Sequence, residues 1–197
     1  MGIKLIYFSF LPDKDGFTPH GYKELQHKKA LALLKYAVKK EHGYDTDNMI
    51  LLTNAHGKPF FKEYPDIHFN LSHCTGMAVC MTSEYSCGVD AETVREYKHR
   101  TASKVLSNSE LSQLESSTDK NTTFFRFWTL KESFVKSIGY GFAYPLNSVS
   151  FSLEENGTIS CSDADCFCSQ FFIGKHIVSA CSAINSESDH TREEVVI

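Results

Sequence analysis

The segment Asp66-Ile-His-Phe-Asn-Leu-Ser-His73 marks the point where the pattern of the chain changes from helix to sheet. Its apolar residues Ile67, Phe69 and Leu71 occupy alternate positions, and the residues between them are polar. A period of two residues is typical of a β-strand that buries one face. The segment therefore predicts a half-buried strand with its polar side chains on the opposite face.

The sequence on both sides of this strand predicts a mixture of helix and sheet. Before it, residues 3–10 and 49–53 are typical of strands, and residues 22–40 carry apolar side chains at helical spacing. After it, residues 77–82 and 86–92 are expected to be its antiparallel neighbours. This half of the chain thus predicts one long helix beside a small sheet.

The second half of the chain repeats the theme of helices followed by strands. Ser107 and Glu110 have the spacing of a capping box at a helix start, and residues 124–138 have the clearest apolar helix face in the chain. Strands are expected at residues 149–153, 158–161, 167–173 and 176–183. The pattern predicts an α+β fold of two similar-sized lobes, residues 1–94 and residues 95–197.

The composition of the 197 residues narrows the class of protein. Hydrophobic residues make up 42% and charged residues 22%, so the chain can form a core and is not disordered as a whole. The formal net charge of −4 argues against a nucleic-acid partner, which would call for a basic surface. The longest apolar run, residues 77–81, is far shorter than the roughly 20 residues of a membrane-spanning helix. We therefore expect neither a nucleic-acid nor a membrane partner.

The cysteines and the first residues indicate a cytoplasmic protein. Residues 3–10 lack the small-residue cleavage site that a secretory signal would need. Seven cysteines, an odd number in a chain of this size, favour free thiols in a reducing compartment. Cys161, Cys166 and Cys168 lie close together in sequence, but they lack C-x-x-C spacing. We therefore favour thiols over a zinc site there.

Two carboxylates occupy alternate positions of the strand predicted over residues 86–92. Asp90 and Glu92 share one face of this strand, with backbone positions roughly 6.5 to 7 Å apart. Oxygen ligands at that spacing can converge on one hard cation, and Gly88 allows another backbone to approach closely. The alternative is a solvated strand face, which is the commoner explanation for such a pair taken alone.

The helix predicted over residues 124–138 carries a second pair of charges. Glu132 and Lys136 are four positions apart and therefore lie on one helix face, with Thr129 one turn before them. The alternative here is an ordinary surface ion pair, which contributes only about a few tenths of a kcal/mol. Taken alone, this alternative is again the commoner one.

A hydroxyl and an imidazole end the alternating strand. Ser72 and His73 come just before a turn that Gly76 relaxes, where they could hold a phosphate. Adjacent residues of a strand point to opposite faces, so Ser72 and His73 are badly placed to act as nucleophile and base of a hydrolase. A purely structural histidine is the commoner alternative at such a position.

These features follow one another in a single order along the chain. The motifs are Gly57-Lys-Pro59, Phe69-Asn-Leu-Ser-His73, Gly88-Val-Asp-Ala-Glu92 and Phe127-Trp-Thr-Leu-Lys-Glu-Ser-Phe-Val-Lys136, followed by Gly139 and Gly141. In this order and spacing the chain resembles the 4'-phosphopantetheinyl transferases of the surfactin-synthetase-activating type. The resemblance covers residues 57–141.

The resemblance implies a fold and a reaction. The family fold is a pair of α+β lobes related by a pseudo-twofold axis, each a mostly antiparallel sheet with packed helices, and the site lies between them. The reaction transfers the 4'-phosphopantetheine arm of coenzyme A to a serine of an apo acyl or peptidyl carrier protein, with Mg²⁺, and releases 3',5'-bisphosphoadenosine. Such carriers serve fatty acid, polyketide or nonribosomal peptide biosynthesis. A chain with both lobes need not pair to build the site, so a monomer is expected.

The resemblance also implies roles for the charged residues. Asp90, Glu92 and Glu132 would hold Mg²⁺ against the pyrophosphate of coenzyme A. Glu132 would in addition activate the carrier serine, directly or through water. Lys136 would neutralise charge on the phosphate, which makes Glu132 and Lys136 the expected catalytic residues.

The remaining expected contacts are with coenzyme A and the carrier. Phosphate oxygens would be held by Ser72 and His73, and the adenine nucleotide would be bordered by Gly57, Lys58 and Pro59. The candidate for the 3'-phosphate is Lys28 or Lys29. Residues 95–114 occupy the place where the family docks its carrier, and their basic bias would steer an acidic carrier helix. The alternative for this stretch is a solvated helix face.

Two other functions fit some of these residues. A metal-dependent nuclease or phosphodiesterase also uses clustered carboxylates and a lysine, but a nucleic-acid substrate calls for a basic groove that the charge balance does not provide. A non-catalytic protein that binds coenzyme A or a carrier would be expected to lack one of the three carboxylates, and all three are present.

Overall fold

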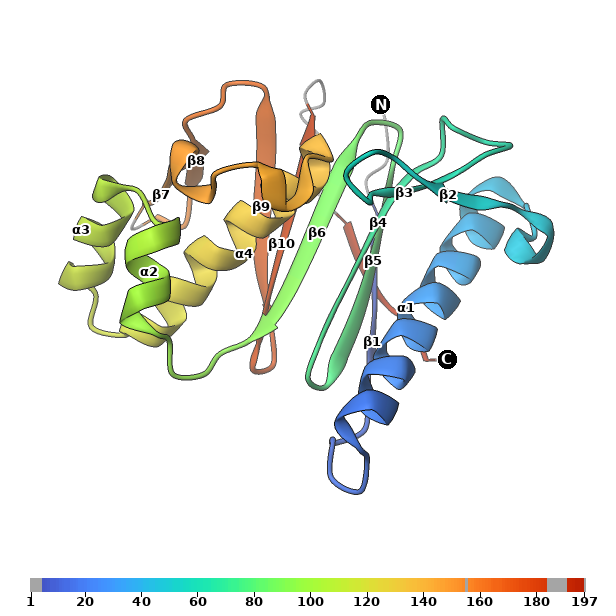
Figure 1. The fold of residues 1–197 in the computed structure, drawn as a ribbon, viewed down its shortest axis with the longest axis horizontal. Helices are drawn as coiled ribbons and strands as arrows, with labels where there is room; N and C mark the ends of the chain where they lie inside the picture. The colour runs from blue at the N-terminus through green and yellow to red at the C-terminus, as the bar shows by residue number, and fades with distance from the viewer. Residues whose placement is uncertain (1–4, 155, 184–190, 197) are drawn as a thin grey trace.

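The computed structural model describes residues 5–154, 156–183 and 191–196 of the chain, which form four layers (Figure 1). Helix α1 (Pro19–His42) covers one sheet, a second sheet packs against the first, and helix α4 (Lys120–Ile138) covers the second sheet. One apolar core lies beneath α1, one between the sheets and one beneath α4. The predicted α+β class is confirmed, and each sheet carries one long helix on its outer face.

The first sheet has four strands in the order β11-β1-β5-β4. Their bounds are Leu5–Phe10 for β1, His68–Cys74 for β4, Met77–Ser83 for β5 and Thr191–Glu194 for β11. β4 pairs antiparallel with β5, as predicted, and β5 pairs antiparallel with β1. β11 pairs parallel with β1. The sequence did not predict β11, because its residues Thr-Arg-Glu-Glu are polar and show no strand period.

The second sheet has three antiparallel strands in the order β6-β10-β9, with bounds Cys87–Thr93, His176–Ala183 and Cys166–Ile173. β6 was predicted to pair with β4, and this prediction is wrong, because the β6 backbone pairs with β10. β4 contacts β6 through side chains instead. Val89 N donates to Asn70 Oδ1 at 2.9 Å, and Ala91 N donates to Ser72 Oγ at 3.2 Å. The two sheets, which pack against each other over the central core, thus also touch along their edge strands β4 and β6.

The division into lobes after residue 94 stays a prediction, and strand pairing crosses it in both directions. β6 comes from the first half of the chain but belongs to the second sheet, and β11 comes from the second half but belongs to the first sheet. The two halves therefore exchange one strand each, which local sequence patterns do not reveal.

The long helices begin and end at recognisable caps. Thr18 accepts a hydrogen bond from the backbone at the start of α1, and Gly43, with a φ of 73°, follows its end. α4 begins at Lys120 rather than at residue 124, because Asp119 caps it before the apolar face starts. Gly139 ends α4 in the same left-handed conformation, as predicted.

Smaller elements surround this frame. They are α2 (His99–Val105), α3 (Asn108–Ser116), the hairpins β2 (Leu51–Thr53) with β3 (Pro59–Phe61) and β7 (Phe151–Leu153) with β8 (Ile159–Cys161), and the 3-10 turns η1 (Thr46–Asn48), η2 (Gly141–Ala143) and η3 (Leu146–Ser148). The predicted capping box of α3 is confirmed, with Ser107 and Glu110 bonded reciprocally. In the described part of the chain, no helix has both the length and the apolar character needed to cross a membrane.

Glu110 also takes part in a fully buried ion pair. Its carboxylate lies 2.7 Å from Lys131 Nζ, and both side chains have 0% exposure. The Lys131 ammonium donates to the carbonyls of Leu146 at 2.9 Å and Val149 at 2.6 Å, while Glu110 accepts from Phe151 N at 2.9 Å. One satisfied charged network therefore joins α3 and α4 to the segment that leads into β7.

The cysteines correct the expectation that all seven are free thiols. Cys168 on β9 and Cys181 on β10 form a disulfide. The antiparallel register places these two residues directly opposite each other. Sequence spacing alone could not show this disulfide, because the pairing of β9 with β10 in the folded sheet decides which residue lies opposite Cys168.

Candidate functional site

Three of the predicted site residues meet where β4, β6 and α4 come together. Lys136 Nζ on α4 lies 2.6 Å from Asp90 Oδ1 on β6. The same ammonium donates to Val89 O at 3.1 Å and to Ser72 Oγ on β4 at 3.3 Å. We call Ser72, Asp90 and Lys136 the junction cluster, because they join the edges of both sheets to α4.

The close contact of β6 with α4 depends on Gly88. A Cβ atom there would lie 2.1 Å from Ser133 O and 2.4 Å from Ser137 N, which are backbone atoms that cannot move aside alone. We therefore expect Gly88→Ala to push α4 away from β6 and to lower the free energy of unfolding by about 3 kcal/mol. Denaturant titration measures this loss, and the bond between Lys136 and Asp90 should weaken with it.

Gly157→Ala is the matched control for this prediction. Its Cβ would meet no atom within 4 Å, although the φ of 87° disfavours any side chain there. That variant should lose only about 1 to 2 kcal/mol. If Gly88→Ala were no less stable than Gly157→Ala, the proposed steric role of Gly88 would be rejected.

The two carboxylate oxygens of Asp90 have different surroundings. Oδ1 accepts from Ser72 Oγ at 3.0 Å and from Lys136 Nζ. Oδ2 is buried and has no hydrogen-bond partner among the described residues. An unpartnered buried oxygen costs stability, and a carboxylate oxygen is the ligand that a hard cation such as Mg²⁺ prefers. Asp90 therefore fits a metal ligand.

Glu132 lies one turn before Lys136 on α4. Burial raises the pKa of its carboxyl, and the negative charge of Asp90 raises this pKa further, while Lys136 lowers it. Glu132 is thus close enough to the junction cluster to interact with its charges. A cation held by both carboxylates would relieve their repulsion, so this pair of oxygen donors suits Mg²⁺.

Glu92 is held differently from the other two carboxylates. Arg95 Nη1 donates to Glu92 Oε2 at 2.7 Å. In the described ranges, the trio of potential metal ligands within 4.8 Å of one another consists of cysteines and includes none of these carboxylates. Asp90, Glu92 and Glu132 thus do not form such a group in this structure, in which Lys136 pairs with Asp90 and Arg95 pairs with Glu92. Of these two neighbouring carboxylates, Asp90 raises the pKa of Glu132 more than Glu92 does.

His73 is half-buried on β4 and is surrounded by basic groups. Burial lowers the pKa of its imidazole, and the charges of Lys136, His27 and Lys23 lower it further. His73 is therefore neutral at neutral pH. Sequence reasoning missed Lys23 and His27, whose four-residue spacing on one face of α1 is the signal that could have found them. Of the two lysines predicted to hold the 3'-phosphate, Lys28 is exposed on the same helix and Lys29 is partly buried there.

The loop over residues 57–59 is fastened by Lys58. Its ammonium donates to Ser86 Oγ at 3.0 Å, to Cys87 O at 2.9 Å and to Ser137 O at 3.0 Å. These contacts occupy all three donors of the ammonium, and burial lowers its pKa. Lys58 thus positions the loop against α4, and its charge is not available as a free cation.

Two cavities lie on either side of Lys136. One, of about 210 Å³, is bounded by the loop over residues 57–59 and the end of α4. The other, of about 220 Å³ and largely apolar, is bounded by Glu132, Tyr144 and Leu146. Lys136 lines both cavities. A ligand with a phosphate at Lys136 could therefore extend to both sides.

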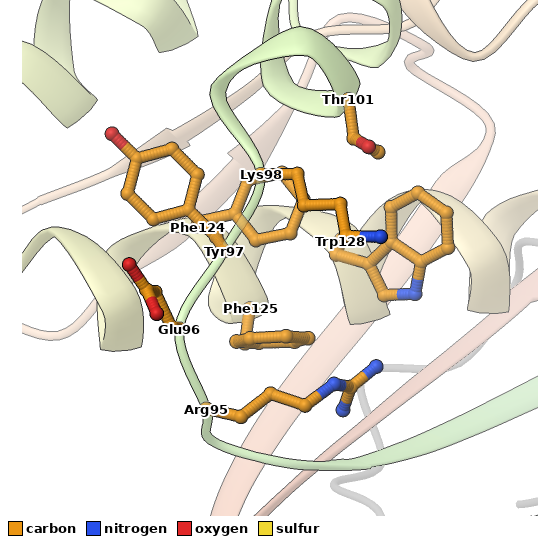
Figure 2. Close-up of a pocket in the computed structure, with 8 residues that line it drawn as sticks. All are labelled: Arg95, Glu96, Tyr97, Lys98, Thr101, Phe124, Phe125 and Trp128. Atoms are coloured by element: carbon orange, nitrogen blue, oxygen red, sulfur yellow. The ribbon is translucent and has the colours of Figure 1, made fainter.

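A third hollow, of about 270 Å³, opens beside the start of α2 (Figure 2). Its walls are Arg95, Glu96, Tyr97, Lys98, Thr101, Phe124, Phe125 and Trp128. Figure 2 shows the Arg95 guanidinium against the face of Phe125, 4.5 Å from the ring centre. The hollow combines aromatic surface with basic side chains, and it lies in the stretch predicted to meet a carrier.

Fold and site together define the class of protein. It is an α+β protein whose two sheets meet at a lysine and two carboxylates, with cavities on both sides of the lysine. Such a site is suited to a phosphate-containing ligand, because it offers positive charge, donors and ligands for a cation.

Comparison with known proteins gives the family. Residues 86–187 match the model of the 4'-phosphopantetheinyl transferase superfamily. A 4'-phosphopantetheinyl transferase of Bacillus subtilis is 32% identical over 143 residues, which are 71% of this chain and 64% of that protein. The transferase gsp of Aneurinibacillus migulanus is 36% identical over 114 residues, 57% of this chain and 46% of that protein. The chain belongs to the 4'-phosphopantetheinyl transferase superfamily, and it spans less than two thirds of the length of these relatives.

Among solved structures, the chain is similar to the holo-[acyl-carrier-protein] synthase of Thermotoga maritima. The TM-score is 0.44 at 21% identity, covering 50% of this chain and 62% of that chain. A likeness at this level is too weak to define a shared fold.

Proposed function

We propose that this chain transfers the 4'-phosphopantetheine group of coenzyme A to a serine of an apo acyl or peptidyl carrier protein, in a Mg²⁺-dependent reaction. The other product is 3',5'-bisphosphoadenosine. The observation that supports this most is the junction cluster, in which Lys136 joins Asp90 and Ser72 beside Glu132. Membership of the superfamily supports the same activity.

Lys136 is the residue on which coenzyme A binding would centre. Its side chain is 28% exposed and lines both cavities, so it can contact the pyrophosphate that joins the nucleotide to the pantetheine arm. Its longest contact, 3.3 Å to Ser72 Oγ, is the one most easily exchanged for a phosphate oxygen. The nucleotide would then lie against the loop over residues 57–59, and the arm beside Glu132.

Glu132 would remove the proton from the carrier serine as its oxygen attacks the phosphorus next to the pantetheine arm. A phosphate ester forms, and the bond from that phosphorus to the bisphosphoadenosine breaks. The raised pKa of Glu132 makes its carboxylate a stronger proton acceptor. Asp90 and Glu132, with Glu92 if Arg95 releases it, would hold Mg²⁺, which neutralises pyrophosphate charge when bound.

The carrier would dock on the third hollow and the basic stretch that follows it. Basic residues of this stretch are Arg95, Lys98, His99, Arg100 and Lys104. Their charge would attract an acidic carrier helix even though the chain as a whole is acidic. The aromatic floor of the hollow, Phe124, Phe125 and Trp128, offers apolar contact for the same partner.

The decisive experiment is the mass of a purified apo carrier after incubation with this protein, coenzyme A and Mg²⁺. An increase by one 4'-phosphopantetheine group, absent without coenzyme A, is expected. Binding without a change in mass would indicate a non-catalytic protein and would overturn the proposal. Cleavage of a nucleic acid in a parallel reaction, with no change in carrier mass, would favour the nuclease alternative.

Lys136→Ala is expected to weaken coenzyme A binding about ten-fold or more, because a charge-assisted contact to phosphate contributes roughly 1.5 to 3 kcal/mol. His73→Ala should have a smaller effect, since a neutral imidazole donates one hydrogen bond. Calorimetric titration measures both. Dephospho-coenzyme A provides the control, because its affinity should fall with Lys136→Ala and not with Lys28→Ala. Equal coenzyme A affinity for wild type and Lys136→Ala would remove Lys136 from the site.

A further inference from the structure

Four of the cysteines come together where β8, β9 and β10 meet. Cys166 Sγ lies 3.2 Å from Cys168 Sγ, which is itself bonded to Cys181. Cys168 has no thiol hydrogen in this disulfide, so Cys166 directs its S–H toward a disulfide sulfur. Cys161, at the end of β8, is the other sulfur to which Cys166 can donate its single S–H. A chain of sulfur contacts thus runs from Cys161 to Cys181.

The two ends of this chain differ in exposure. Cys181 is 0% exposed and lies beneath α4, with its sulfur 3.1 Å from Ser133 Oγ. Cys161 and Cys166 are only partly buried. A reagent in solution therefore reaches Cys161 and Cys166 but cannot approach Cys181. Cys168 is also partly buried, so Cys181 alone is the closed end of the chain, and the two thiols lie at the open end.

We propose that Cys161, Cys166, Cys168 and Cys181 form a thiol–disulfide relay, through which small thiols and disulfides in solution exchange with the Cys168–Cys181 bond. We call these residues the cysteine relay. The inference does not rest on the proposed transferase activity, because none of the four residues belongs to the junction cluster.

The first exchange moves the disulfide by one position. Cys161, as a thiolate, takes the proton of Cys166, and the Cys166 thiolate attacks Cys168 Sγ. The Cys166–Cys168 bond forms, the Cys168–Cys181 bond breaks, and Cys181 leaves as a thiolate with the electron pair. The number of disulfides is unchanged, so no oxidant or reductant is consumed.

The second exchange brings the disulfide to the open end. Cys161 gives its proton to water and attacks Cys166 Sγ, so that the Cys161–Cys166 bond forms and Cys168 leaves as a thiolate. Cys168 and Cys181 then take up one proton from water and share it, as Cys161 and Cys166 shared one at the start. A small thiol can now attack the Cys161–Cys166 bond, and a second one completes its reduction, releasing the small-molecule disulfide.

The surroundings of Cys161 favour its thiolate. The hydrogen bond from Cys166 lowers the pKa of the Cys161 thiol, and the positive charge of Lys131 contributes in the same direction, against the effect of burial. Thiolates are the attacking species in disulfide exchange. Cys161 is therefore suited to accept the first proton and to make the second attack.

The test follows the disulfides during reduction by glutathione. Wild-type protein is oxidised, mixed with reduced glutathione, quenched with an alkylating reagent at intervals, and mapped by peptide mass spectrometry. We expect a Cys161–Cys166 linkage to appear before Cys181 becomes alkylated. In Cys166→Ser the Cys168–Cys181 bond should still form, but its reduction should slow about ten-fold or more, because the attacking thiol is gone.

Two further variants keep the test decisive. Cys161→Ser should accumulate the Cys166–Cys168 linkage, which also serves if Cys166→Ser folds poorly. Cys80→Ala, a buried cysteine on β5 in the first sheet, should reduce like wild type. Equal reduction rates for wild type and Cys166→Ser would overturn the proposal. So would wild-type protein that holds one zinc ion on these thiols and forms no Cys168–Cys181 bond when oxidised.

Discussion

Glu132→Ala is expected to lower the rate of carrier modification roughly 10³-fold, because the carboxylate would both accept the serine proton and help to hold the cation. Asp90→Ala should have an effect of similar size. Asp90 supplies Oδ2, a buried oxygen without a hydrogen-bond partner among the described residues, and its other oxygen orients Lys136. The measurement is the initial rate of holo-carrier formation at saturating coenzyme A and Mg²⁺.

Both variants must be shown to fold before their rates are interpreted. Thermal unfolding and circular dichroism serve for this, and Asp90→Asn provides a variant of unchanged size. Glu154→Ala, an exposed carboxylate beside the β7–β8 hairpin, is the control and should retain the wild-type rate. If Glu132→Ala or Asp90→Ala keeps more than about a tenth of wild-type turnover, the role given to that residue is wrong.

Lys131→Met is expected to lower the free energy of unfolding by about 3 to 5 kcal/mol, the cost of leaving a buried charge without its partner. Glu110 would then remain at 0% exposure without the ammonium that neutralises it. The carbonyls of Leu146 and Val149 would also lose their shared donor. Urea titration of the purified variant measures the change.

Lys120→Met is the matched control for Lys131→Met. Lys120 Nζ lies 2.6 Å from Glu115 Oε2, but its side chain is 41% exposed. Removing such a surface pair should cost about 0 to 1 kcal/mol. The double variant Lys131→Met with Glu110→Leu should regain much of the loss, apart from about 1 kcal/mol for the α3 cap. A Lys131→Met protein as stable as Lys120→Met would contradict the prediction.

Elements with a strong local period were predictable from the sequence. The alternation over residues 66–73 gave β4, and the apolar face over residues 124–138 gave most of α4. In both cases the burial of one face sets the spacing of the apolar residues, so the pattern can be recognised within the segment alone. The capping box of α3 is local in the same sense, because its two partners lie three residues apart.

Strand partners were less predictable, because they depend on the whole fold. β6 carries a strand pattern, yet nothing in it says that its backbone pairs with β10 while β4 offers only side chains. The Cys168–Cys181 disulfide was missed for the same reason. The packing of the whole chain decides which distant segments pair, and the pattern of a single segment carries no information about that packing.

The candidate site shows the same division. The order of motifs singled out Ser72, Asp90 and Lys136, and the structure brings these three together. The motifs did not show that the Lys58 ammonium donates all its hydrogen bonds within the protein, or that Arg95 donates a hydrogen bond to Glu92. These contacts form between side chains that become neighbours only after folding.

The parallel pairing of β1 with β11 has a consequence for synthesis on the ribosome. β1 finds its partner β5 once Ser83 has emerged, but its other edge pairs with residues 191–194. The roughly 110 residues between them take about 5 to 20 seconds to translate at typical rates. During that interval the nascent chain presents an open strand edge, to which neighbouring nascent chains on the same messenger could add. Completion of the first sheet therefore waits until residues 191–194 have been translated, however early its other strands assemble.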